Sequence, residues 1–176
     1  PELIEIADAR KARFIHVAAE FVVADITQPD WKQSLPGAPH AQPAGSSTFD
    51  IAVALAVLHH IPSFEMRCAV LRDIHALLQP RGTLIMTNWH FERNERLRKK
   101  IVPWQTVGIN EHDLEPGDAL LEWKRGGVGY RYCHLITKTE VRRMAEQSGF
   151  EVIKQFYADA DLNLYSVLMA HQTADR

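Results

Sequence analysis

The sequence lacks the features that define several large protein classes. It has only two cysteines, Cys68 and Cys133, in 176 residues. This is too few for a disulfide framework, so we expect reduced thiols in a cytoplasmic protein. No apolar run approaches the roughly 18 residues that a membrane-spanning helix needs, and we therefore expect no membrane partner. The formal net charge of −2 gives no global signature of nucleic-acid binding.

Several sequence motifs of catalysis and binding are also missing. No Gly-x-Ser-x-Gly sequence occurs, which argues against an α/β hydrolase. The glycine cluster at residues 126–129 does not follow a buried strand and open a helix. It therefore predicts a hairpin turn and not a nucleotide-binding loop. The adjacent residues His59 and His60 lack the Cys-x-x-Cys or His-x-x-x-His spacing of a metal site, so we expect no bound metal.

What the sequence does contain is a strand–helix–strand pattern between Phe49 and Phe91. Residues 51–57 are almost continuously apolar, which is typical of a strand buried on both faces of a parallel sheet. Ser63 can cap a following helix, and residues 83–89 predict a second strand. The apolar residues of that helix recur at helical spacing: Met66, Val70, Ile74, Leu77 and Leu78. Because such a connection joins parallel neighbours, the predicted fold class is α/β.

The flanking segments add further elements. Residues 1–13 predict a helix and residues 20–25 a short strand. Thr137 and Glu140 have the spacing of a capping box, which predicts a helix that ends at Gly149. Residues 150–157 and 162–170 predict two final strands.

The segment FDIAVALAVLHHIP, the helix after it and the sequence LLQPRGTLI resemble the fourth and fifth strands of class I S-adenosylmethionine-dependent methyltransferases. That family usually has Gly-Gly where this chain has Arg81-Gly82. The resemblance implies a Rossmann-like sheet with helices on both faces and a C-terminal antiparallel hairpin. It also implies S-adenosylmethionine as cofactor, and one domain over residues 1–176 with a substrate-side insertion at about residues 90–135.

The start of the chain, PELIEIA, resembles the helix that follows the second strand in that family. The resemblance therefore implies that the first strand, the glycine-rich loop, the first helix and the second strand are absent from this chain. In the resembled sheet, the missing strands lie between the strand that ends at Asp25 and the strand that starts at Asp50. We therefore expect exposed apolar edges and weak or no cofactor binding by these 176 residues alone.

By resemblance, six residues are candidate cofactor contacts: Asp25, Ile26, Ala54, Leu55, Ala56 and His60. The carboxylate of Asp25 would accept the adenine amino group, and the alternative is an aspartate that caps its own loop. The small residues at 54–56 would let the backbone approach the methionine part, and the alternative is simple core packing. His60 would line the pocket, and the alternative is a general base.

The segment from Val102 to Tyr165 resembles a narrower branch, the tRNA wobble-uridine carboxymethyl methyltransferases. The matching positions are Gly117, Asp118, Leu120, Trp123, Arg131, Tyr132, His134, Glu140, Asn163 and Tyr165. This branch implies methyl transfer to a carboxylate or modified uridine of tRNA, and a small activator subunit as partner. The alternatives are a small-molecule methyltransferase, a non-catalytic methyltransferase-like binding or scaffold subunit, and another Rossmann-type enzyme such as a dehydrogenase.

A carboxylate is already a nucleophile, so its methylation needs positioning and a cation more than a strong base. We name three catalytic candidates on this ground. Arg131 can hold a carboxylate by a bidentate pair, and Tyr132 and His134 can orient it or stack on a base. The alternative is an amphipathic strand with polar outward residues. The basic run from Arg93 to Lys100 either meets phosphates or forms a solvated helix face.

Overall fold

The computed structural model describes residues 2–11, 19–35, 49–124 and 126–171. The chain divides into two compact units, Pro1–Ser46 and Ser47–Arg176, and each is described by itself. The first unit contains helix α1 (Glu2–Lys11) and the 3-10 helix η1 (Trp31–Ser34). Helix α1 confirms the helix expected over residues 1–13, of which residues 1, 12 and 13 lie outside the described part.

The strand expected over residues 20–25 is wrong. Residues 19–25 have no regular secondary structure, and Phe21 and Val23 are exposed. A strand satisfies its backbone groups only by pairing with another strand. The described residues of the first unit contain no strand with which this apolar segment pairs.

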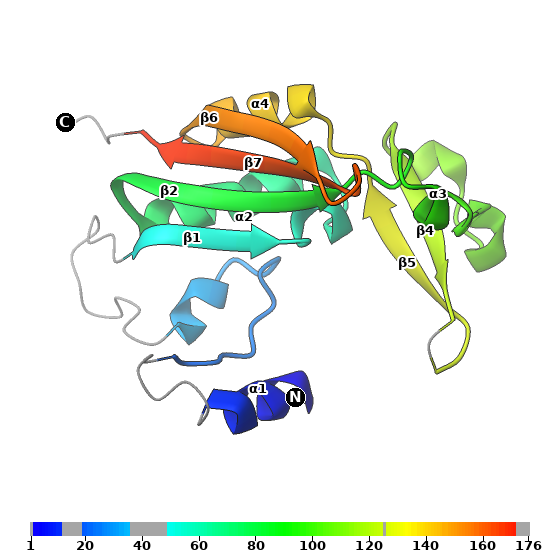
Figure 1. Cartoon of the computed structure of the whole chain (residues 1–176), viewed down its shortest axis with the longest axis horizontal. Coiled ribbons are helices and arrows are strands. Elements are labelled where there is room, and N and C mark those ends of the chain that lie inside the picture. The colour runs from blue at the N-terminus through cyan, green and yellow to red at the C-terminus, as the bar shows by residue number, and fades with distance from the viewer. Residues whose placement is uncertain (1, 12–18, 36–48, 125, 172–176) are drawn as a thin grey trace. The chain divides into compact units, whose positions relative to one another are not determined.

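The second unit contains a four-stranded sheet with the order β1-β2-β7-β6 (Figure 1). Its strands are β1 (Phe49–Leu55), β2 (Leu78–Trp89), β6 (Phe150–Ala158) and β7 (Asn163–Ala170). β1 and β2 are parallel, whereas β7 runs antiparallel to both β2 and β6. The predicted α/β class, the parallel strand–helix–strand unit and the terminal hairpin are confirmed.

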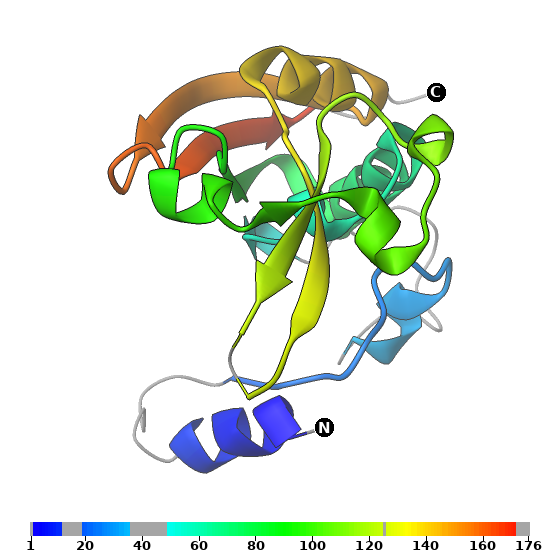
Figure 2. The same cartoon turned by 90° about the vertical axis from the view of Figure 1, so that its right-hand side faces the viewer.

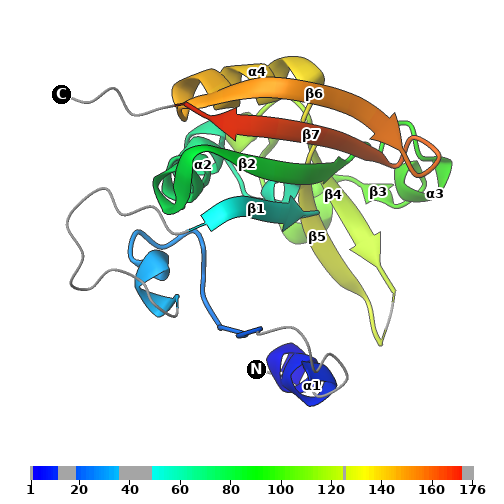
Figure 3. The ribbon, with the colours of Figure 1, turned by 60° about the vertical axis from the view of Figure 1, so that its left-hand side comes forward.

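Two helices, α2 (Phe64–Leu77) and α4 (Lys138–Gln147), lie on the same face of this sheet (Figures 1 and 3). Both begin at the predicted caps. The Ser63 hydroxyl accepts a hydrogen bond from the Met66 N–H at 3.3 Å, and the Thr137 hydroxyl accepts one from the Glu140 N–H at 3.1 Å. The even-numbered residues of β7 are buried against this face.

The opposite face of β1 is not buried as the sequence predicts. Ile51, Val53 and Leu55 are 59%, 57% and 60% exposed, whereas Ala54 is buried. Ala54 pairs with Met86, which is also buried. The expectation of burial on both faces is wrong for this strand, because the two helices of its unit cover one face of the sheet.

A second, three-stranded antiparallel sheet has the order β3-β4-β5 (Figure 2). Its strands are β3 (Ile101–Val102), β4 (Asp118–Trp123) and β5 (Gly129–His134). The β4–β5 pairing confirms the predicted hairpin around residues 126–129. The short helices of this unit are η2 (Leu58–His60), α3 (Glu95–Arg98), η3 (Trp104–Val107) and η4 (Glu111–Asp113). None of the helices in the described part of the chain has the length and apolar character that crossing a membrane requires.

The end of α4 depends on a glycine. Gly149 has a φ of +80°, and a Cβ atom there would lie 2.9 Å from Nε2 of His75. Gly108 has a φ of +73°, but a Cβ atom there would meet nothing within 4 Å. An L-residue at either position would be strained by the left-handed backbone, at a cost of roughly 1–2 kcal/mol. Only at position 149 would its Cβ atom also crowd another side chain.

We expect Gly149→Ala to lower the free energy of unfolding by more than Gly108→Ala, because the His75 ring must also move. Urea unfolding of the two variants measures the difference. An equal decrease in the free energy of unfolding in the two variants would show that the His75 ring moves aside at no energetic cost.

Candidate functional site

A sharp turn ends β1 at the carboxyl edge of the first sheet. Ala56 has a φ of +56°, and its N–H donates to the carbonyl oxygen and to the hydroxyl of Thr87, both at 3.0 Å. This turn leads the chain into η2. Non-glycine residues in the left-handed region often mark functional sites, and ligands of α/β sheets bind outside the carboxyl ends of the strands.

Five side chains gather at this edge from η2, β2 and β5, and we call them the strand-end cluster: His59, His60, Trp89, Arg131 and Cys133. The His60 and Trp89 rings lie 5.3 Å apart, nearly perpendicular. Nδ1 of His60 lies 2.9 Å from the Tyr132 carbonyl oxygen, to which it donates. The Arg131 guanidinium lies 4.8 Å from the Trp123 ring centroid and 5.8 Å from that of Trp89.

Both histidines of the cluster are neutral at pH 7. Burial, followed by the neighbouring His60 and Arg131, lowers the pKa of His59 to about 3. Burial also lowers the pKa of His60, and Arg131 lowers it further, against the opposing effect of the Tyr132 carbonyl. Because Nδ1 of His60 donates to that carbonyl, Nε2 carries the free lone pair. The cluster therefore pairs one fixed cation with one neutral hydrogen-bond acceptor.

His59, His60 and Cys133 are also residue types that bind metals, and their ligand atoms lie within 4.8 Å of one another. However, burial raises the pKa of the Cys133 thiol to about 12, whereas metals bind the thiolate. Nδ1 of His59 accepts a hydrogen bond from the Trp89 N–H at 3.4 Å. The three side chains are thus neutral and at least half-buried, although Nε2 of His59 has no hydrogen-bond partner among the described residues. The absence of a bound metal stays a prediction.

A second group of six residues forms what we call the buried ion network: Arg67, Glu115, Asp118, Tyr132, His134 and Glu140. Arg67, which is 1% exposed, lies at its centre. Its Nη2 lies 2.6 Å from Glu115 and 3.0 Å from Glu140, and its Nη1 donates to the Ile61 carbonyl at 3.0 Å. Burial raises the pKa of Glu115, but hydrogen bonds from the Phe64 N–H and Arg67 outweigh it, and the pKa is lowered.

His134 and Tyr132 are fully engaged by carboxylates of this network. The two ring nitrogens of His134 lie 2.6 Å from Asp118 and 3.0 Å from Glu140, and the Tyr132 hydroxyl donates to Asp118 at 2.6 Å. Burial lowers the pKa of His134, but its bonds to Glu140 and Asp118 outweigh this and raise the pKa above its usual value. Burial and Asp118 raise the pKa of Tyr132.

The three catalytic candidates thus lie on one strand but on two of its faces. Successive side chains of a strand point in opposite directions. β5 accordingly presents Arg131 to the strand-end cluster, and Tyr132 and His134 to the buried ion network. The structure brings Arg131 close to the two histidines and separates it from its two predicted partners. Their catalytic roles stay predictions.

The sequence analysis missed Trp89 and the centre of the network, Arg67. Trp89 is the last residue of a predicted strand. Because ligands of α/β sheets bind at the carboxyl ends of strands, this position could have identified it as a site residue. Arg67 lies three residues before Val70, which the helical pattern places on the apolar face. A charged residue on that face signals a buried partner.

In the first unit, Asp25 has the arrangement of a loop-capping aspartate. Its Oδ1 accepts hydrogen bonds from the N–H and the hydroxyl of Thr27, at 3.0 and 2.7 Å, and these bonds lower its pKa. Its Oδ2 receives only a 3.4 Å contact from Gln28, so lone pairs remain for another donor. The cofactor roles of Asp25 and Ile26 stay predictions.

Comparison with known proteins gives a consistent picture. Residues 2–155 match the family model described as "Methyltransferase domain". A curated protein from Schizosaccharomyces pombe, named tRNA (carboxymethyluridine(34)-5-O)-methyltransferase, is 26% identical over 129 residues, which cover 65% of this chain and 55% of that protein. The chain therefore spans about half the length of this relative.

Solved structures share the fold at low sequence identity. An S-adenosylmethionine-dependent methyltransferase from Methanosarcina mazei superimposes with a TM-score of 0.62 at 19% identity, covering 97% of this chain and 78% of that one. Another from Clostridium acetobutylicum gives 0.62 at 7% identity, covering 95% and 72%. These likenesses confirm the predicted Rossmann-like methyltransferase fold.

The buried ion network gives a prediction for Arg67. We expect Arg67→Met to lower the free energy of unfolding by about 3 kcal/mol, because it leaves two buried or half-buried carboxylates without their cation. Arg72→Met, at an exposed arginine of the same helix, is the control and should cost less than about 0.5 kcal/mol. Urea unfolding measures both. Equal effects would show that the network does not stabilise the fold.

The same network gives a prediction for the effect of pH on stability. The pKa of His134 is raised in the folded protein, so its charge contributes stability that is complete below about pH 6.5, the unfolded pKa. This contribution is lost as the pH rises through the folded pKa. We expect the stability difference between wild type and His134→Gln to shrink from pH 6 to pH 9. The control is His112→Gln, at an exposed histidine. A pH-independent difference for His134→Gln contradicts the raised pKa.

Proposed function

The chain belongs to the methyltransferase domain family, and on this premise we propose that it transfers a methyl group from S-adenosylmethionine to a carboxylate on a modified uridine of tRNA. One observation carries the choice of a carboxylate. Arg131, next to Trp123 and Trp89, presents a guanidinium at the carboxyl ends of β1 and β2. The printed name of the S. pombe relative, a tRNA carboxymethyluridine methyltransferase, supports the acceptor class.

The end of β1 fits the proposed cofactor. Residues 54 and 56 are alanines, so their small side chains let a ligand approach the backbone where the strand ends. We propose that the backbone of residues 54–56 holds the methionine part. When bound, S-adenosylmethionine supplies a methyl group that passes to the acceptor oxygen, while the electron pair of the broken C–S bond stays on sulfur.

The residues of the strand-end cluster then have distinct tasks. Arg131 binds the acceptor carboxylate through parallel N–H···O bonds, and the Trp123 ring restricts the plane of the guanidinium. No proton has to be removed, because the carboxylate attacks as an anion. Nε2 of the neutral His60 accepts a hydrogen bond from the substrate without adding charge. The product ester is neutral, so its attraction to Arg131 falls and its release is favoured.

The test uses the product of the complete reading frame and tritiated S-adenosylmethionine. We expect label to enter tRNA that carries the free carboxylate, and to be released as methanol by mild base, as esters are. Arg131→Gln should lower kcat/KM for tRNA by about 10- to 100-fold, because it removes a charge-assisted hydrogen-bond pair. Cofactor affinity should stay unchanged.

The control is Arg142→Gln, an exposed arginine of α4, which should retain wild-type activity. Base-stable label would contradict ester formation, and equal activity of the two variants would contradict the role of Arg131. Label in small carboxylic acids but not in tRNA would favour a small-molecule methyltransferase. Failure to bind the cofactor in calorimetric titration would favour a non-catalytic subunit. Activity that appears only with a small activator subunit would identify that partner.

A further inference from the structure

We propose that a cavity beside the strand-end cluster binds the nucleotide that flanks the methyl acceptor in the same RNA strand; this rests on the proposed function. The cavity has a volume of about 370 Å³. Two tryptophans, Trp89 and Trp123, and three cations, Arg96, Lys100 and Lys124, line it. Two leucines complete the lining that the described residues provide, so no carboxylate among them faces the cavity.

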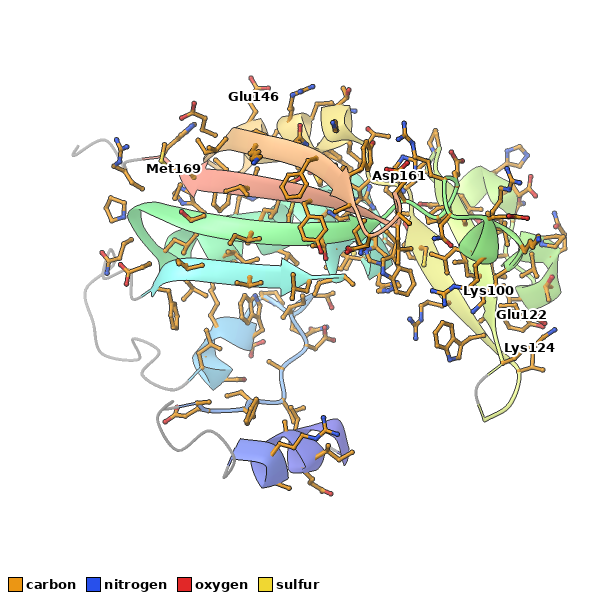
Figure 4. The ribbon with its side chains drawn as sticks, viewed as in Figure 1. Lys100, Glu122, Lys124, Glu146, Asp161 and Met169 are labelled. Carbon is orange, nitrogen blue, oxygen red and sulfur yellow. The ribbon has the colours of Figure 1, made fainter. Side chains whose placement is uncertain are left out.

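The backbone around α3 holds two of these cations in place. Arg96 and Lys100 are four residues apart along a helical turn, a spacing that places side chains on one side. Leu97, between them, is buried and anchors the turn. The Glu122 N–H donates to the Lys100 carbonyl at 2.8 Å, which ties the turn to β4 beside Trp123. Figure 4 labels Lys100 on the turn after α3, Glu122 on β4 and Lys124 just after β4.

The cavity carries an excess of positive charge. Among the described residues, Arg96 forms no ion pair and Lys100 has no carboxylate partner. Nζ of Lys100 instead lies 4.4 Å from the Trp123 ring centroid. Lys124 pairs with Glu122 at 2.8 Å, and Arg131 adds a further cation over Trp123. An anionic occupant therefore matches the cavity.

The volume of the cavity and its tryptophan lining favour a nucleotide as the anionic occupant. Cavities that bind small organic ligands measure roughly 300–1,000 Å³, so this one suits a base with its sugar and phosphate. Single-stranded nucleic acids bind where a positive groove for the backbone adjoins aromatic rings on which bases stack. A free inorganic phosphate would make no use of the tryptophan and leucine surface that lines the cavity.

The position of the cavity links it to the proposed acceptor site. Trp89 lines the cavity, and its ring also lies 5.3 Å from His60 and 5.8 Å from the Arg131 guanidinium. A nucleotide in the cavity is therefore a neighbour of a carboxylate held by Arg131. Its contacts are to phosphate and to ring faces, which predicts recognition without base specificity.

The experiment compares two double variants that each remove two positive charges from the same short segment. Arg96→Ala with Lys100→Ala alters the cavity, whereas Arg98→Ala with Lys99→Ala alters neighbours that do not line it. Dissociation constants for a single-stranded anticodon-loop RNA are measured by fluorescence anisotropy over a range of salt concentrations. Unfolding midpoints confirm that each variant is folded.

We expect the cavity variant to bind the RNA at least about tenfold more weakly than wild type. We also expect the slope of log K against log salt to become less negative by about 1.4, for the loss of two phosphate contacts on a single strand. The control variant should weaken RNA binding by less than about threefold, because its two charges do not line the cavity and salt screens charges that make no direct contact. Equal weakening of the two variants would overturn the subsite. Displacement of the RNA by millimolar inorganic phosphate at matched ionic strength would also overturn it, by indicating an ion site only.

The same variants separate this subsite from the proposed function. RNA binding that falls selectively in the cavity variant supports the subsite, even if wild type methylates no tRNA and the proposed function is lost. Methylation of tRNA with equal KM in the cavity and control variants would overturn the subsite and leave the proposed function in place.

Discussion

The second unit depends on the burial of one guanidinium. Arg67 projects from α2 and binds the Ile61 carbonyl after η2, Glu115 before β4, and Glu140 on α4. A buried cation without such partners would cost several kcal/mol. Burial of Arg67 therefore requires that these three segments lie next to it. Glu140 also binds His134 on β5. The ion pairs therefore connect the helices that pack on the first sheet with a strand of the second sheet.

This network also determines what β5 presents to the strand-end cluster. Tyr132 and His134 are bound to Asp118 across the β4–β5 ladder, so the alternating face of the strand must carry Arg131. A shift of one residue in the register would exchange the two faces and replace the guanidinium by a phenol or an imidazole. The polar residues that the sequence suggested as catalytic partners thus fix the orientation of Arg131 from the other side of the strand.

The features that the sequence predicted correctly depend on local patterns. The cap at Ser63, the helix after Thr137 and the two final strands follow from spacing within about a dozen residues. The predictions that are wrong concern contacts between residues that lie far apart in the sequence. Whether residues 51–57 are buried depends on what covers the sheet, and residues 20–25 form a strand only if another strand pairs with them. Glu140 fits a capping box by spacing, but its carboxylate binds Arg67 and His134.

The basic run from Arg93 to Lys100 shows why local sequence also fails to divide charges by role. The net charge and the length of the run do not distinguish one cation from another, but in the folded chain these cations have different neighbours. Lys99 pairs with Glu95 and Arg93 approaches Asp161, whereas Arg96 and Lys100 line a cavity with two tryptophans. A chain with a net charge of −2 can therefore present a concentrated positive field at one place, because binding follows the local arrangement of charge and not its sum.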